Sequence, residues 1–152
     1  MTLKIKLIFL VIFVAFIAFS CKPTENFKQL QTTYIPDAIS GLYIGMPLDE
    51  LKDLRGAHKL SFTQKKELSI FKEEYSKDSI NIIQYQFDKN NKLCEIIIEY
   101  ISDYNVYKKL KASLGEPNFG NQWLITLDEK FKLRIWGYAN SLCIANDKQF
   151  KE

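Results

Sequence analysis

The single histidine and the three cysteines have the widest chemical range in this 152-residue chain. His58 follows Gly56 in a predicted loop, and no Cys-x-x-Cys or His-x-x-x-His spacing supplies the three or four ligands of a zinc site. A Ser-His-Asp or Cys-His arrangement would have to use His58, and no nucleophile motif accompanies it. No glycine-rich phosphate-binding segment is present either. We therefore interpret His58 as an exposed loop residue and predict no catalytic residue, metal site or cofactor.

The acidic side chains are numerous, but their spacing identifies no catalytic pair. The adjacent pairs Asp49-Glu50 and Glu73-Glu74 point in different directions in a helix or a strand, so neither pair converges on one substrate. A solvated acidic surface is the expected role of such residues. A small hydrolase or carbohydrate-binding enzyme stays an alternative, and it requires two carboxylates about 5–10 Å apart over a cleft.

Aromatic and basic residues alternate with apolar ones along the predicted strand 131–138. Phe131, Leu133 and Ile135 share one face of this strand. The other face carries Lys132, Arg134, Trp136 and Tyr138. If the first face is the core, these four residues form an exposed patch of the kind that is enriched in protein interfaces. The alternative is that both faces of the strand are buried.

Cys94 and Cys143 remain when Cys21 is set aside as a lipidation site. Each falls in a predicted strand, and an exported protein meets an oxidising compartment in which a disulfide is permitted. A bridge would need Cα atoms within about 7 Å, which the sequence does not show. We expect two buried free thiols and keep a disulfide as the alternative.

Two predicted helices and seven predicted strands must position these residues. The helices occupy 45–56 and 102–114; Ser102-Asp103 is the expected cap of the second, and Leu48, Leu51 and Leu54 form the apolar stripe of the first. Period-2 patterns predict strands at 60–64, 70–75, 80–87, 93–101, 122–127, 131–138 and 142–145. This pattern predicts an α+β domain over 41–148.

The two helices divide the expected domain into two similar halves, 41–101 and 102–148. Gly56 aligns with Gly115, and Cys94 aligns with Cys143, with the second half one strand shorter. Two tandem units, each a helix followed by an antiparallel meander, are therefore expected side by side. Chance is the alternative explanation for so short a self-similarity.

The N-terminus has the pattern of a secretory signal. Lys4 and Lys6 precede thirteen uncharged apolar residues, Leu7–Phe19, which as a helix span about 20 Å, whereas the hydrocarbon of a bilayer is about 30 Å thick. The alternatives are a permanent anchor helix or an ordinary signal that ends near a cysteine. Residues 21–40 carry two prolines and no sustained period, so we expect a tether there, with an arm packed on the domain as its alternative.

The segment Ala18-Phe19-Ser20-Cys21 resembles the lipobox of bacterial lipoproteins. That resemblance implies cleavage of the signal peptide 1–20 and fatty-acyl chains, such as palmitate, on Cys21 that attach the protein to a membrane. Lys22 stands where an aspartate retains enterobacterial lipoproteins in the inner membrane, which favours the outer membrane. The expected location is the bacterial cell envelope.

Gly45-Met46 followed by Leu51 at the start of the first helix resembles the SmpA/OmlA family of small outer-membrane lipoproteins. A doubled unit of this kind is similar to the β-lactamase-inhibitor-protein type of fold. The resemblance implies a lipid-tethered α+β module that binds other envelope proteins and performs no catalysis. An inhibitor of a secreted enzyme would have the same architecture.

The charge balance excludes one large class of partner. The chain has 21 basic and 18 acidic side chains without a basic cluster, so no nucleic-acid footprint is present. The sequence therefore predicts a non-enzymatic, membrane-attached module that binds or scaffolds envelope proteins, and it does not specify an oligomeric state.

Overall fold

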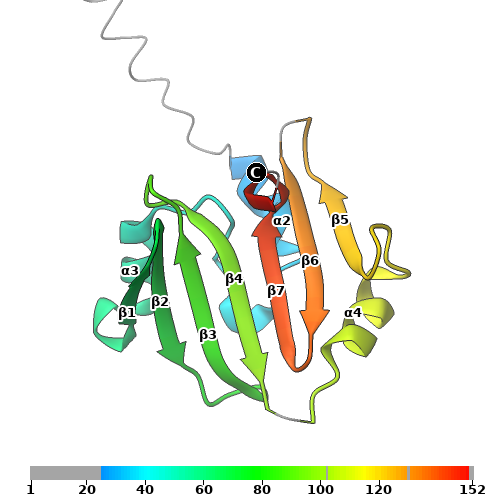
Figure 1. Cartoon of the computed structure of the whole chain (residues 1–152), viewed down its shortest axis with the longest axis horizontal. Coiled ribbons are helices and arrows are strands. Elements are labelled where there is room, and N and C mark those ends of the chain that lie inside the picture. Colours follow the sequence, from blue (N-terminus) through cyan, green and yellow to red (C-terminus); the bar gives the residue numbers. More distant parts are fainter. Residues whose placement is uncertain (1–24, 102, 130, 151–152) are drawn as a thin grey trace, which may run out of the picture.

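A seven-stranded antiparallel sheet forms the framework of the computed structural model, which describes residues 25–101, 103–129 and 131–150 (Figure 1). The strands are β1 (Ser61–Lys65), β2 (Leu68–Glu74), β3 (Ile80–Phe87), β4 (Leu93–Tyr100), β5 (Gln122–Thr126), β6 (Lys132–Tyr138) and β7 (Ser141–Asn146). Their order across the sheet is β1-β2-β3-β4-β7-β6-β5. The expected α+β class and the seven expected strands are confirmed.

The period-2 patterns that predicted the strands also determine which side of each strand is buried. In β3, Ile83, Tyr85 and Phe87 are fully buried, whereas Gln84 between them is partly exposed. Ile83 pairs with Ile98 of β4, which is buried as well. Cross-strand pairs of this kind continue over the sheet and form one apolar face that requires a cover.

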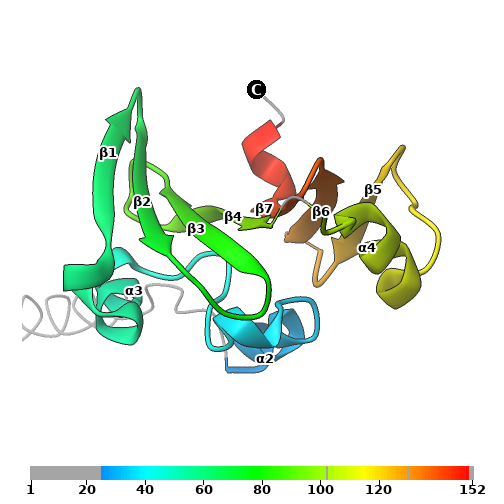
Figure 2. The same cartoon turned by 90° about the horizontal axis from the view of Figure 1, so that it is seen from below.

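Helices cover this apolar face. They are α2 (Glu25–Thr32), α3 (Leu48–Arg55) and α4 (Val106–Leu114), with short 3₁₀ segments η1 (Asp37–Ile39), η2 (Ala57–Lys59) and η3 (Asp147–Phe150). Figure 2 shows α2 and α3 on one side of the curved sheet and η3 on the other. A Cβ built on Gly137 would come within 3.2 Å of the backbone of Tyr107, so α4 packs closely against β6 on the apolar face. None of the helices in the described part of the chain is both long and apolar enough to cross a bilayer.

The ends of the two predicted helices differ in detail from expectation. Helix α3 follows Pro47 and ends at Gly56, whose φ of 80° suits a glycine. Its predicted apolar stripe is shorter than expected, because Leu51 is buried but Leu54 is 47% exposed. Helix α4 begins after Asn105, whose side chain accepts a hydrogen bond from the Lys108 amide at 2.9 Å. The expected cap at Ser102-Asp103 is therefore wrong.

The expected tether differs from the structure from Glu25 onward. Gln31 attaches helix α2 to the backbone of Ile44. Its buried side-chain amide accepts a hydrogen bond from the Ile44 N–H at 2.8 Å and donates one to the Ile44 carbonyl at 3.2 Å. Ile35 and Ile39 are also buried in the core. Residues 25–40 therefore pack as part of the domain, since the Gln31 side chain provides hydrogen-bond partners for both the N–H and the carbonyl of Ile44. Residues 1–24, including the expected signal and Cys21, lie outside the described residues.

A buried ion pair joins α3 to the sheet. The Nε and Nη2 atoms of Arg55 each donate a hydrogen bond to the Glu73 carboxylate at 2.9 Å. The buried Tyr85 hydroxyl donates to the same carboxylate at 2.9 Å. Burial raises the pKa of the Tyr85 hydroxyl, so it stays protonated and can donate. This cluster fixes α3 over β2 and β3.

Candidate functional site

The face of the sheet opposite α2, α3 and α4 is the candidate functional surface. In Figure 2 the two ends of the sheet, β1 and β5, curve toward the side on which η3 lies, so we call this side the concave face. Its residues follow from the strand register. One row across the sheet contains Ile70, Gln86, Glu95, Ala145 and Arg134. The next row contains Lys72, Gln84, Ile97, Cys143 and Trp136.

A groove lies on the concave face where β1, β2 and β3 adjoin. Its volume is about 830 Å³, and its lining is rich in amide and lysine side chains. Gln84 and Gln86 of β3 lie at its inner edge, and Ile70 contributes an apolar floor. A shallow groove with polar walls is suited to an extended polar ligand and does not enclose a small apolar molecule.

The four predicted patch residues share one side of β6, as their alternation requires. Tyr138 is 76% exposed, whereas Lys132, Arg134 and Trp136 are partly exposed. Leu133 and Ile135 on the opposite side are buried in the core. The structure therefore places these four side chains on the concave face, with Tyr138 as its most exposed aromatic residue.

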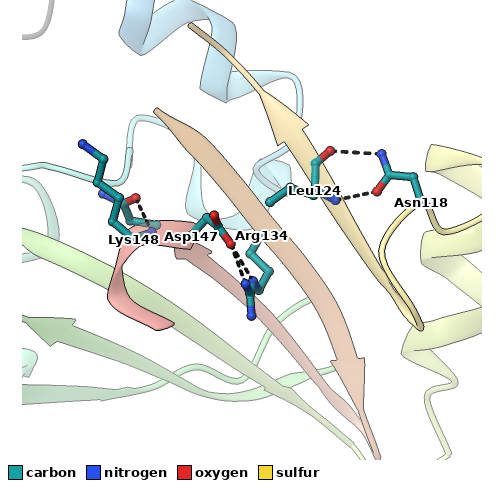
Figure 3. A network of polar contacts seen from close by, with 6 residues as sticks. Asn118, Leu124, Arg134, Asp147 and Lys148 are labelled. Carbon is teal, nitrogen blue, oxygen red and sulfur yellow. Dashed lines mark hydrogen bonds and ion pairs between the residues drawn. The ribbon is translucent and has the colours of Figure 1, made fainter. Parts of the chain in front are cut away.

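Arg134 already has partners within the chain. Its guanidinium forms an ion pair with Asp147 of η3 (Figure 3). The same group lies 5.2 Å from the centroid of the Phe119 ring. Asn118 makes two hydrogen bonds to the Leu124 backbone and so ties the loop that carries Phe119 to β5 (Figure 3). Arg134 therefore connects β6 to η3 and to this loop. It is a partly exposed member of the patch that also stabilises the fold.

Glu95 is a concave-face residue that sequence reasoning missed. It lies in the centre of the sheet on β4, between Gln86 and Ala145, and is only 9% exposed. No described residue forms a hydrogen bond or ion pair with its carboxyl group. Burial raises the pKa of the Glu95 carboxyl to about 7. The alternation of β4 correctly predicts that Glu95 lies on the other face of the strand from Ile96 and Ile98. It gave no indication that this face is buried at Glu95, so the sequence suggested a solvent-exposed carboxylate.

Cys94 and Cys143 are buried and form no disulfide in this structure. Cys143 lies on β7 between Ile97 and Trp136, and burial raises the pKa of its thiol to about 12, with the nearby Glu95 charge adding to the effect. Cys94 lies at the irregularity where β3 and β4 change register, and its thiol donates to the Gln86 carbonyl at 3.2 Å. The Cys143 thiol therefore lacks the lowered pKa that a nucleophilic cysteine has.

The other candidate residues do not converge on a reaction centre. His58 is exposed in η2, which precedes β1 at one edge of the sheet, whereas Arg134 lies on β6 near the other edge. The Glu73 carboxylate is paired with Arg55. Within the described ranges, no cluster of three or more histidine, cysteine or acidic side chains could hold a metal ion. The acidic residues with buried carboxylates serve mainly as partners of structural cations, so they form no pair over a cleft.

Comparison with known proteins adds no assignment to this geometry. No family model, no curated protein and no solved structure matches the chain.

Proposed function

We propose that this chain is a lipid-anchored protein of the bacterial cell envelope whose domain binds another envelope protein through the concave face. The observation that carries the proposal is the position of Tyr138 and Trp136 on the one face of the sheet that the three helices leave uncovered. Aromatic side chains bring large contact areas at low cost in side-chain entropy, so they are favoured as binding anchors.

The same face supports binding better than catalysis. Glu73, on the apolar face, and Asp147 are engaged by arginines, and Glu95 is buried in the sheet without a second carboxylate paired with it across a groove. A glycosidase-type reaction would need such a pair. Inhibition of a secreted enzyme is one form that the binding could take, because it uses a surface and no catalytic group.

We also propose that the fold consists of two helix-plus-meander units with a common ancestry. Helix α3 precedes β1–β4 and helix α4 precedes β5–β7, and the last strands of both runs, β4 and β7, pair at the centre of the sheet. Ile96 pairs with Ile144 at this junction. A resemblance to the SmpA/OmlA type of lipoprotein module supports the same division of the chain.

Site-specific photocrosslinking in intact cells tests the binding surface. A benzoylphenylalanine in place of Tyr138 should crosslink one envelope protein, and the same group in place of Leu54, a large exposed residue on α3, should not. The partner is then identified and purified, and Tyr138→Ala should weaken its binding by about tenfold or more. Equal crosslinking from both positions, or unchanged binding by Tyr138→Ala, would contradict the proposal.

Mass spectrometry of the mature N-terminus tests the anchor. We expect a chain that begins at Cys21 and carries the mass of diacylglycerol, and we expect Cys21→Ser to block processing and to release the protein from sedimenting membranes. An unmodified Cys21 or a retained Met1 would contradict the anchoring proposal without bearing on the binding face.

A further inference from the structure

Strand β1 presents an unpaired edge at one end of the sheet. It pairs with β2 alone among the strands in the described part of the chain, and all five of its residues are exposed. Its register with β2 is continuous, and it contains no proline. Bulges, prolines and charged side chains commonly prevent a further strand from adding to an edge; β1 has neither a bulge nor a proline, and Lys65 is its one charged residue.

The hairpin geometry identifies the backbone groups that face this free edge. Lys65 pairs with Leu68 across a two-residue turn in which Lys66 has a φ of 54°. Such a turn closes on a hydrogen-bonded residue pair, and in an antiparallel ladder the alternate residues direct both backbone groups to the other side. Phe62 and Gln64 therefore direct their N–H and C=O groups outward, where an added strand can pair with them.

The groove beside this edge has an excess of positive charge. Lys65, Lys66 and Lys72 line it, with Glu67 as its only acidic residue. A strand added to β1 would place alternate side chains on the concave face, directly opposite Lys65 and two strands from Lys72, with β1 between them. Acidic side chains at these positions would meet the lysines, whereas basic ones would be repelled.

We propose that the free edge of β1 accepts an extended acidic segment of a partner protein, which adds to the sheet as an eighth strand beside the lysine-lined groove. The inference rests on the proposed protein-binding function and names the chemistry of the partner and its mode of attachment. A second copy of this chain is disfavoured as the occupant, because its β1 edge would add Lys65 and Lys66 to an edge whose groove already has an excess of positive charge.

Titration of the full-length protein in detergent with synthetic peptides tests the inference. The probe is a capped peptide of about nine residues, long enough to span β1, in which glutamate alternates with valine and threonine. A peptide with lysine in place of each glutamate is its control. The acidic peptide should bind and slow the hydrogen exchange of the Phe62 and Gln64 amides, and the lysine peptide should not.

Two matched variants separate strand addition from a purely electrostatic contact. Gln64→Pro removes one outward N–H, which an edge strand tolerates, whereas Gln64→Thr removes the same side chain and keeps the N–H. We expect Gln64→Pro to weaken binding of the acidic peptide by about tenfold and Gln64→Thr to leave it nearly unchanged. Lys72→Gln should weaken it as well, and Lys108→Gln on α4 should not.

Several results would overturn the inference. These are binding of neither peptide, equal binding of both, or equal effects of Gln64→Pro and Gln64→Thr. A dimer in sedimentation that Gln64→Pro converts to a monomer would assign the edge to a second copy instead. Because crosslinking from position 138 is measured separately, a failed titration with that crosslink intact would reject the acidic strand and leave the proposed binding function standing.

Discussion

The carboxyl group of Glu95 makes the stability of this domain depend on pH in a direction that is unusual for an acidic residue. It is 9% exposed at the centre of the sheet, and burial raises its pKa from an ordinary value of 4.5 to about 7. In its row of the concave face the charged side chain is Arg134, two strands away and already paired with Asp147. The Cys143 thiol on the next strand is neutral, because burial raises its pKa to about 12. Neither group compensates the ionised form.

The sign of the effect follows from proton binding. Between pH 4.5 and 7 the folded state keeps the Glu95 proton that the unfolded chain has lost, so the free energy of unfolding falls as pH rises through this window. Each unit of pKa difference corresponds to 1.36 kcal/mol, which gives a loss of up to about 3 kcal/mol that is complete above pH 7. Glu95→Gln removes the ionisation and should therefore stabilise the domain at pH 8 by up to about 3 kcal/mol relative to its effect at pH 4.

Urea unfolding followed by tryptophan fluorescence, to which the buried Trp123 contributes, measures this difference at each pH. The control is Glu99→Gln, because Glu99 lies on the same strand and face but is partly exposed. The difference between Glu95→Gln and the unaltered protein should grow from pH 4 to pH 8. If that difference does not change with pH, or if the Glu95 carboxyl titrates below pH 5 by carbon NMR, the argument from burial is refuted.

Three further predictions concern groups inside the domain. Arg55→Met leaves the buried carboxylate of Glu73 without its cation and should lower the free energy of unfolding by about 3 kcal/mol. The double variant with Glu73→Leu should recover only part of this loss, because the buried Tyr85 hydroxyl then lacks its acceptor. A single-variant loss below about 1 kcal/mol would contradict this. Gln31→Leu leaves two buried backbone groups unpaired and should lower the same quantity in urea unfolding by about 2–3 kcal/mol, whereas Gln29→Leu on the exposed side of α2 should change it little. Cys143 should react with a thiol reagent only after urea unfolding, because its thiol is buried. Rapid labelling of Cys143 in the folded protein would contradict that burial.

The strands β2 to β7 were predictable from the sequence because each has one face in the core, whereas all five residues of β1 are exposed. The alternation of Ile83, Tyr85 and Phe87 with glutamines could be satisfied only by a strand with one buried side. The same reasoning placed Leu133 and Ile135 inside and the aromatic residues of β6 on the other face. Period-2 patterns therefore carried both the sheet and the face on which the candidate site lies.

The features that sequence reasoning missed depend on contacts between distant residues. Helix α2 is held by the amide of Gln31 on the backbone of Ile44, and a glutamine in a polar segment gives no period that would indicate burial. The ion pair of Arg134 with Asp147 forms across 13 residues of chain and depends on where η3 returns over the sheet. Glu95 is buried because its neighbours on both adjoining strands close around it, and a charged residue type argues against that outcome.

The early start of α2 determines how freely the domain can move if Cys21 carries the proposed lipid. From Cys21 to Glu25 the chain advances only four residues, which reach at most about 14 Å whatever their conformation. A linker of this length keeps the start of α2 close to the membrane surface and restricts how far the domain can move or rotate relative to the bilayer. Its orientation toward a neighbour would then be set largely at the membrane, before any contact is made.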